Sequence, residues 1–227
     1  MIALPGDHIV ENNVILDIEK QCNALIKPEW LNAVYGIRAW DIACCMKYVP
    51  PKKTDVVLDI GCGESPFIFF IANYVTKVYG IDNNTFANYM AWFETLTEFD
   101  DYNKGKVKVI TQNAAKLPFD DESINIVYTF SALEHFDGDD DSKCMKEIYR
   151  VLTPGGIFCG TVDFNPVTEY PIEDNNLVRV YTYESLVKRL IEPSGMSLLG
   201  EFHRLNPMPE SVNYIAAPMF FALVKDK

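Results

Sequence analysis

The sequence is short of basic residues, has no long apolar run and contains no internal repeat. Lysine and arginine number 20 against 32 aspartate and glutamate residues, which gives a formal net charge of −12. Affinity for nucleic acid comes largely from Lys and Arg side chains that neutralise phosphates, so we expect no DNA or RNA partner. A bilayer span needs about 20 apolar residues. The most apolar stretches, 67–75 and 214–224, are shorter and have polar flanks, so we predict no membrane span.

Metal and disulfide patterns are missing as well. None of the six cysteines forms a Cys-x-x-Cys pair or stands at zinc-ligand spacing. The acidic run at 137–141 matches no complete metal-binding loop, so we expect no metal. Because the N-terminus has neither a basic leader nor an apolar signal core, we expect a cytoplasmic protein with reduced thiols. Nothing in the sequence indicates an oligomeric state.

What the chain does contain is 227 residues of alternating strand and helix patterns, enough for one large α/β unit. Residues 1–53 carry apolar side chains at helical spacing and end near Pro50-Pro51, where proline prevents a helix from continuing. We predict an N-terminal helical cap over 1–53 and a single compact unit over 54–227.

Short apolar runs predict strands, and apolar residues at every third or fourth position predict helices. The predicted strands are 56–60, 77–82, 106–111, 123–130, 157–162, 196–205 and 213–224, and the helices that follow the cap are 66–74, 86–96, 139–152 and 183–191. This alternation predicts a doubly wound, mostly parallel, seven-stranded sheet, whose two closing strands are candidates for antiparallel pairing.

A glycine-rich corner follows the first predicted strand. Gly61 and Gly63 allow a positive φ and let a ligand approach the main chain. Ser65 can accept from the first N–H groups of the next helix, and Pro66 suits the first helical position. Asp59 lies at the carboxyl end of the strand, where open α/β sheets bind their ligands. The corner therefore predicts a cofactor site, although a tight turn that binds nothing fits the same residues.

An acid at the end of the second predicted strand strengthens this interpretation. Asp82 lies 19 residues after Gly63, close to the spacing of about 20 at which a carboxylate meets the ribose of an adenine nucleotide. A nicotinamide-dependent oxidoreductase uses the same arrangement but expects a third glycine at position 66, where this sequence has Pro66. That class is therefore the less favoured alternative.

Four ordered motifs carry a family resemblance. Val-Leu-Asp-Ile-Gly-Cys-Gly is followed by Val-Tyr-Gly-Ile-Asp, then Leu-Pro-Phe-Asp-Asp-Glu-Ser, then Glu-Ile-Tyr-Arg-Val-Leu-Thr-Pro-Gly-Gly. In this order the chain resembles the class I S-adenosylmethionine-dependent methyltransferases of the type 11-like, small-molecule group, over residues 54–163. The resemblance implies a Rossmann-like methyltransferase fold with S-adenosyl-L-methionine as cofactor.

The resemblance also implies roles for matching residues. Asp59, Gly61 and Gly63 would surround the methionine portion of the cofactor, Asp82 would hold the ribose, and Asn83 would lie beside the adenosine. Asn113 departs from the acid that often binds the adenine amine. The implied cofactor site comprises Asp59, Gly61, Cys62, Gly63, Asp82, Asn83, Asn113, Ala114 and Ser131.

His135 is the candidate general base, because the family commonly places residues that face the methyl group after the fourth strand. Its ordinary pKa near 6.5 suits proton removal at neutral pH. A structural histidine that closes the pocket is the alternative.

The acceptor pocket is expected from the parts outside the resemblance, with the cap over 1–53 contributing to it. Its candidate residues are Trp30, Tyr35, Phe164, Tyr170 and Tyr181. Aromatic residues of this kind also pack helices onto sheets, so packing is the alternative role.

The sequence thus predicts an enzyme that transfers a methyl group from S-adenosylmethionine to a nucleophilic atom of a small-molecule acceptor. Because the sulfonium is already an activated electrophile, direct in-line displacement requires alignment and no nucleophilic side chain. A non-catalytic protein that binds S-adenosylmethionine or a partner is the alternative from another class.

Overall fold

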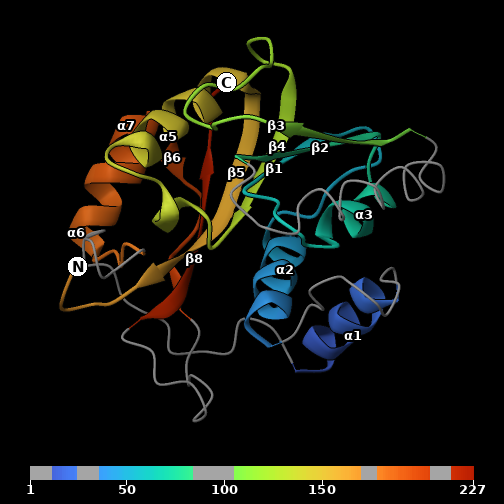
Figure 1. The fold of residues 1–227 in the computed structure, drawn as a ribbon, viewed down its shortest axis with the longest axis horizontal. Helices are drawn as coiled ribbons and strands as arrows, with labels where there is room; N and C mark the ends of the chain where they lie inside the picture. Colours follow the sequence, from blue (N-terminus) through green and yellow to red (C-terminus); the bar gives the residue numbers. More distant parts are fainter. Residues whose placement is uncertain (1–11, 25–35, 84–104, 170–177, 205–215) are drawn as a thin grey trace.

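A mostly parallel sheet separates two layers of helices in the computed structural model (Figure 1). The structure describes residues 12–24, 36–83, 105–169, 178–204 and 216–227. The predicted helix over 86–96 and the candidate residues Trp30, Tyr35 and Tyr170 lie outside these ranges. Within them, no helix is long and apolar enough to cross a membrane.

The sheet has the order β3-β2-β1-β4-β5-β8, with two short strands on the outer edge of β8. The strands are β1 Val56–Ile60, β2 Lys77–Asp82, β3 Val107–Thr111, β4 Ile124–Phe130, β5 Leu152–Phe164, β6 Ser197–Leu198, β7 His203–Arg204 and β8 Ala217–Val224. The first five positions are parallel, and β8 runs antiparallel to β5. The doubly wound, mostly parallel sheet is confirmed.

The predicted count of seven strands is corrected to eight strands in the described residues, because the strand expected at 196–205 is interrupted. Leu198 pairs with Leu223 and His203 with Phe220, so a step of five residues along this edge corresponds to a step of three residues along β8. Gly200, with φ +81°, lies in the interruption. The two segments share one edge of β8, so the sheet keeps seven positions.

The fifth strand is also longer than the predicted 157–162. It begins at Leu152, which pairs with Ile124, and then runs through the Pro-Gly-Gly turn to Phe164. A register irregularity between Ile124 and Ile126 accommodates the extra residues, as a bulge does. At its other end, β5 extends through Asp163 and Phe164, beyond the predicted end at residue 162.

Alternate residues of the strands bury opposite faces of the sheet. Val57 and Tyr128 belong to one core cluster, whereas Leu58 and Val127 belong to the other. Because side chains alternate along a strand, the near-continuous apolar runs are explained by burial of both faces.

The helices divide between the two faces. α1 Asn12–Asn23, α2 Gly36–Tyr48 and α3 Phe67–Ala72 contribute to the first cluster, and α5 Asp140–Val151, α6 Tyr183–Leu186, η2 Val187–Ile191 and α7 Glu192–Ser194 lie on the other side. The N-terminal helices are thus present as expected. The helix predicted at 183–191 continues to Ser194 through α7.

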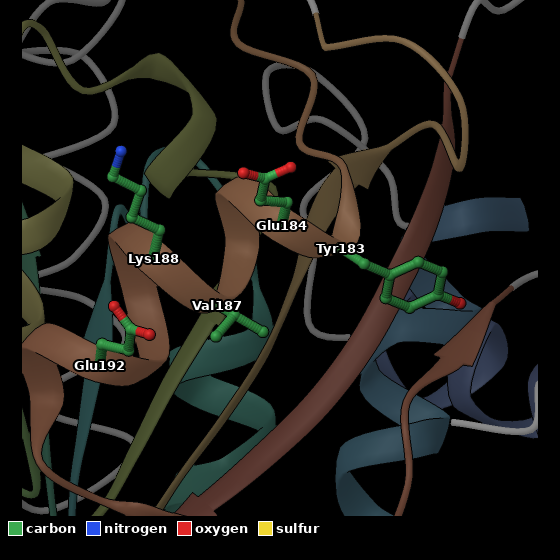
Figure 2. A pocket seen from close by; sticks show the side chains of 5 residues that line it. All are labelled: Tyr183, Glu184, Val187, Lys188 and Glu192. Carbon is green, nitrogen blue, oxygen red and sulfur yellow. The ribbon is translucent and has the colours of Figure 1, made fainter. Parts of the chain in front are cut away.

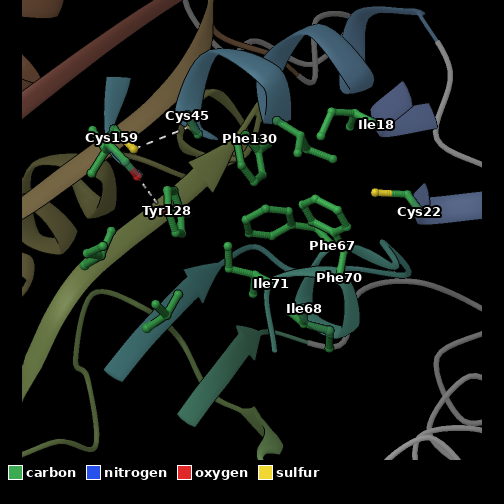
Figure 3. Close-up of a cluster of buried hydrophobic side chains, with 14 of the residues drawn as sticks. Ile18, Cys22, Cys45, Phe67, Ile68, Phe70, Ile71, Tyr128, Phe130 and Cys159 are labelled. Atoms are coloured by element: carbon green, nitrogen blue, oxygen red, sulfur yellow. Dashed lines mark hydrogen bonds between the residues drawn. The ribbon is translucent and has the colours of Figure 1, made fainter. Parts of the chain in front are cut away.

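Helix α2 is fixed to the sheet through the first cluster, in which Phe67 and Phe70 of α3 face Ile18 and Cys22 of α1 (Figure 3). The buried hydroxyl of Tyr128 donates to the carbonyl of Val49 at 3.0 Å. The segment after α2 is therefore anchored directly to β4.

All six cysteines are buried and free of disulfides.

A buried ion-pair network joins residues 178–194 to the start of α5. Asp141 is fully buried and accepts from Arg179 Nη1 at 3.1 Å and from Arg189 Nη2 at 2.7 Å. The hydroxyl of Tyr181 donates to Asp141 Oδ2 at 2.9 Å. One carboxylate thus binds three donor side chains from a segment about forty residues later.

We predict that Asp141→Asn destabilises the fold by about 3 kcal/mol, because removing one partner of a buried ion pair leaves uncompensated charge. The matched control is Asp140→Asn, whose carboxylate pairs with the exposed Lys143 at 2.7 Å and should cost less than about 1 kcal/mol. Urea unfolding of both variants measures the difference, and equal losses would contradict the assignment.

Candidate functional site

The candidate site lies at the carboxyl edge of β1, β2 and β4. Ile60 and Ile81 pair in the parallel register, so the residues that follow β1 and those that end β2 meet at this edge. Such an edge is where open α/β sheets bind ligands. The structure therefore brings the glycine corner and Asp82 together, as the sequence predicted.

Gly61 has no room for a side chain. Its φ is +70°, and a Cβ built there would lie 2.3 Å from the Cβ of Ala132, beyond the end of β4. Its N–H donates to the carbonyl of Ile81 at 2.8 Å. The corner is therefore pressed against the chain after β4 and bonded to β2 at the same time.

Asp82 contacts the corner directly. Gly63, with φ +45°, donates its N–H to Asp82 Oδ2 at 3.0 Å. The carboxylate is 6% exposed. The neighbouring Asn83 is exposed at the end of the strand. The predicted spacing of acid and glycines thus corresponds to a hydrogen bond in the fold.

The residues around the corner adopt the expected helix opening with a shift of one position. Ser65 Oγ accepts from the N–H of Phe67 at 3.3 Å, and α3 begins at Phe67 after Pro66. Cys62 is buried against β2, where its Sγ lies 2.8 Å from the Cβ that Gly80 lacks. Cys62 therefore fills a space that Gly80 leaves open.

Asn113 and Ala114 follow β3 at the same edge. Asn113 is exposed, and its Oδ1 accepts from the N–H of Ala115 at 2.7 Å while its Nδ2 donates to Asp140 Oδ2 at 3.1 Å. Ala114 is buried. The side chain of Asn113 therefore stabilises its own loop, and its role toward a cofactor stays a prediction.

Ser131 follows β4 in an unusual conformation. Its φ is +46°, and its N–H donates to the carbonyl of Thr161 on β5 at 3.0 Å. A positive φ outside glycine is uncommon, and such strained positions cluster at functional sites. His135 follows in the short helix η1, Leu133–His135, with its side chain exposed.

Sequence reasoning missed three of the four acids that gather around Arg38 of α2, since it predicted only Asp59 as a site residue. We call the four the buried acid group: Asp41, Asp59 and Glu134 are buried, and Asp163 is half-buried. Arg38 of α2 pairs with Asp41 Oδ2 at 3.1 Å and opposes the charge of the other three. Its guanidinium also lies 5.7 Å from the ring centroid of Phe130.

Burial controls the protonation of these acids. It raises the pKa of Asp59 to about 8, with a further contribution from Asp82, while Arg38 lowers it. Burial likewise raises the pKa of Asp41 to about 7, against the opposing effect of Arg38. Oδ2 of Asp59 has no hydrogen-bond partner among the described residues. The site thus holds carboxyl groups that gain from a cationic ligand.

Two signals could have found this group. Asp163 follows the predicted strand over 157–162, as the chosen acids follow theirs, and Glu134 precedes the candidate His135. Arg38 and Asp41 stand three positions apart within an apolar helical pattern, which by itself is typical of a solvated helix face.

The acceptor-pocket candidates inside the described ranges lie in the second core. Phe164 and Tyr181 are fully buried, and the two residues pair in one isolated parallel bridge. The hydroxyl of Tyr181 donates a hydrogen bond to Asp141. The packing role is therefore visible for both side chains, and their contact with an acceptor stays a prediction.

A separate open groove of about 460 Å³ lies along α6, η2 and α7 (Figure 2). It is lined by Tyr183, Glu184, Val187, Lys188 and Glu192. Figure 2 shows Tyr183 directed away from Lys188 and Glu192. None of these residues belongs to the predicted site.

Comparison with known proteins agrees with this architecture. A family described as a methyltransferase domain matches residues 58–160, which include the glycine corner, β2 and most of β5. Residues 58–160, just under half of the chain, therefore resemble a methyltransferase domain.

Relatives match the methyltransferase domain over part of their length. A probable S-adenosylmethionine-dependent methyltransferase of Mycolicibacterium smegmatis is 31% identical over 155 residues, 65% of this chain and 55% of the relative. An uncharacterized methyltransferase of Schizosaccharomyces pombe is 32% identical over 134 residues, 56% of this chain and 46% of the relative. The chain thus spans about half the length of these curated relatives.

Solved structures share the fold of the domain at low identity. A putative methyltransferase from Bacillus halodurans aligns with a TM-score of 0.61 and 18% identity, covering 82% of this chain and 99% of the other. The [4+2]-cyclase SpnF aligns with a TM-score of 0.67 and 14% identity over 94% of both chains. The Rossmann-like methyltransferase fold is confirmed, and the cyclase shows that the fold alone leaves the reaction open.

We predict that Asp59→Asn is more stable than wild type at high pH, and that this advantage shrinks at low pH. The folded pKa of about 8 exceeds the ordinary value of 3.8, so the folded wild type loses stability as pH rises between these values. The neutral asparagine escapes this loss, which is on the order of 6 kcal/mol over the whole interval at about 1.4 kcal/mol per pKa unit, about 4 kcal/mol of it between pH 5 and pH 9.

Urea unfolding at pH 5 and pH 9 measures this effect. The matched control is Asp120→Asn, because Asp120 is exposed and its substitution should change stability equally at both pH values. A difference between Asp59→Asn and wild type that does not vary with pH would contradict the burial argument.

Proposed function

We propose that the protein is an enzyme that transfers a methyl group from S-adenosylmethionine to a nucleophilic atom of a small-molecule acceptor. The observation that carries the proposal is the hydrogen bond from Gly63 N–H to Asp82 at the carboxyl edge of the methyltransferase domain. It joins the two features that recognise an adenosine group, a close-approach glycine corner and a ribose-binding acid.

The residues present fit this cofactor. Gly61 holds the corner close to the chain after β4, and Asp59 Oδ2 is a buried acceptor without a partner in the described chain. In the proposal, Asp82 holds the ribose, Asp59 and the glycines hold the methionine portion, and Asn83 lies beside the adenosine. Cys62, Asn113, Ala114 and Ser131 complete the proposed set.

The cofactor supplies an activated methyl group on a sulfonium, so the protein's task is alignment and exclusion of water. Alignment of a nucleophile with the methyl carbon at about 3 to 3.5 Å suffices for in-line displacement. Support comes from relatives named as S-adenosylmethionine-dependent. A Burkholderia thailandensis N1-methyltransferase with a TM-score of 0.64 and 15% identity was solved with S-adenosylhomocysteine.

A small-molecule acceptor is favoured over a macromolecule. The chain is strongly acidic, with a net charge of −12, which disfavours nucleic acid. A matching relative from Caenorhabditis elegans is named as a sterol 4-C-methyltransferase, at 32% identity over 110 residues. We propose that the cap over 1–53 and the aromatic residues Trp30, Tyr35, Phe164, Tyr170 and Tyr181 form the acceptor pocket.

Calorimetric titration tests the cofactor assignment. We expect S-adenosylmethionine and S-adenosylhomocysteine to bind and NAD not to bind. Asp82→Asn should weaken binding about 10- to 150-fold, because a hydrogen bond to a charged group contributes about 1.5 to 3 kcal/mol. Asp120→Asn, an exposed acid outside the site, is the control. Binding of NAD alone would overturn the proposal.

We expect His135→Ala to lower the rate of methyl transfer by about 10²- to 10⁴-fold, the contribution typical of a general base. Its exposed side chain in η1 leaves affinity for the cofactor unchanged. The measurement is turnover from pH 5 to pH 9 with a confirmed acceptor. Turnover equal to wild type at every pH would eliminate the role.

A further inference from the structure

Asp163 is a half-buried acid close to the sheet edge that we propose for the cofactor. It is near the carboxyl end of β5, and side-chain alternation places it on the same sheet face as Cys159 of the first core. Arg38 of α2 and His135 of η1 both act on its charge, and both lower the pKa that burial raises. Three elements that are distant in sequence therefore converge on this carboxylate.

Glu134 lies behind Asp163 as a second carboxyl group. It is fully buried, and neither of its carboxyl oxygens has a well-formed hydrogen bond in the part of the chain that is described. Burial raises the pKa of Glu134 well above its ordinary value, and the charge of Asp163 raises it further, although backbone N–H groups and Arg38 moderate the effect. Burial and the charge of Asp163 therefore both disfavour the charged form of Glu134.

The acids divide into two sides with Arg38 between them. On the side proposed for the cofactor, the charge of Asp82 raises the pKa of Asp59. On the other side, the charge of Asp163 raises the pKa of Glu134, and His135 acts on Asp163. With a cofactor bound at the first side, Arg38 is the one arginine or lysine of the described residues that acts on the charge of the second pair. The second side is therefore suited to a cation from another molecule.

We propose that the acceptor is a basic amine and that Asp163 binds its ammonium group beside His135. This inference rests on the proposed methyl transfer. An ionised carboxylate only accepts hydrogen bonds, and an ammonium group supplies several donors together with a positive charge. A hydroxyl group supplies one donor and no charge, and an anionic acceptor would meet the repulsion of the buried acid group.

The transfer step balances with the groups named. An N–H bond of the bound ammonium breaks, and the proton goes to the imidazole of His135. The nitrogen lone pair then forms the N–C bond to the methyl group as the C–S bond breaks, and that bond's electron pair stays on sulfur. The products are S-adenosylhomocysteine and a methylated ammonium that still carries positive charge.

The experiment uses S-adenosylmethionine labelled in its methyl group and a metabolite extract from the cells that make the protein. The extract is first separated at pH 7 on a cation exchanger into bound and unbound fractions. Each fraction is then incubated with the full chain and the labelled cofactor, and labelled products are resolved by chromatography. We expect label in a product from the bound fraction.

Variants then assign the charge to Asp163. Asp163→Asn should raise the KM for the amine about 10- to 150-fold and leave cofactor affinity within about threefold, and Asp163→Glu should restore part of the loss. The matched control is Asp226→Asn, because β8 places this exposed acid at the opposite end of the sheet. It should behave as wild type.

Three outcomes would overturn the inference. Label found only in products of the unbound fraction would show a neutral or anionic acceptor, with methyl transfer retained. An unchanged KM for the amine in Asp163→Asn would remove Asp163 from its recognition. If the cofactor binds and no fraction is labelled, the amine is excluded as well. Failure of S-adenosylmethionine to bind would instead refute the proposed function itself.

Discussion

The close approach of Gly61 to Ala132 is the contact on which the candidate site depends. Because a Cβ at Gly61 would lie 2.3 Å from that of Ala132, the corner after β1 is pressed onto the chain that leaves β4. The same residue donates to Ile81 of β2. One bare backbone position therefore fixes three strand ends relative to one another, and the side chains that follow these strands inherit their positions.

Buried carboxyl groups make this edge costly for the fold. Glu134 is fully buried without good hydrogen bonds in the described residues, and Asp59 has an oxygen in the same condition. Such groups reduce stability unless a charge or donor reaches them. Two apolar clusters, one on each face of the sheet, maintain the arrangement. Buried polar groups that a well-packed fold retains at a cost to its stability are characteristic of a binding site.

Local patterns predicted most of the sheet and the cofactor side of the site. β1 and β2 have the predicted bounds, and the acid at Asp82 meets the glycine corner as its spacing indicated. These features depend on short apolar runs and on turn residues close to them. A parallel sheet then brings consecutive strand ends together without further information.

The gathering of the buried acid group around Arg38 could not be predicted in this way, because it depends on contacts between distant parts of the chain. In the sequence, Arg38 and Asp41 are typical of a solvated helix face. Only the packing of α2 on β4 and β5 brings them to the site. The interruption between β6 and β7 is equally nonlocal, since it is defined by the register of β8. Sequence spacing carries no information about either arrangement.

The position of Arg38 connects the two halves of the site. It opposes the charge of Asp59 on β1 and of Asp163 on β5, and it is bonded to Asp41 of its own helix. Since solved structures with this fold include both methyltransferases and a [4+2]-cyclase, the sheet alone does not determine the reaction. Chemistry must come from side chains added to the shared edge, and α2 supplies the cation that both groups of acids share.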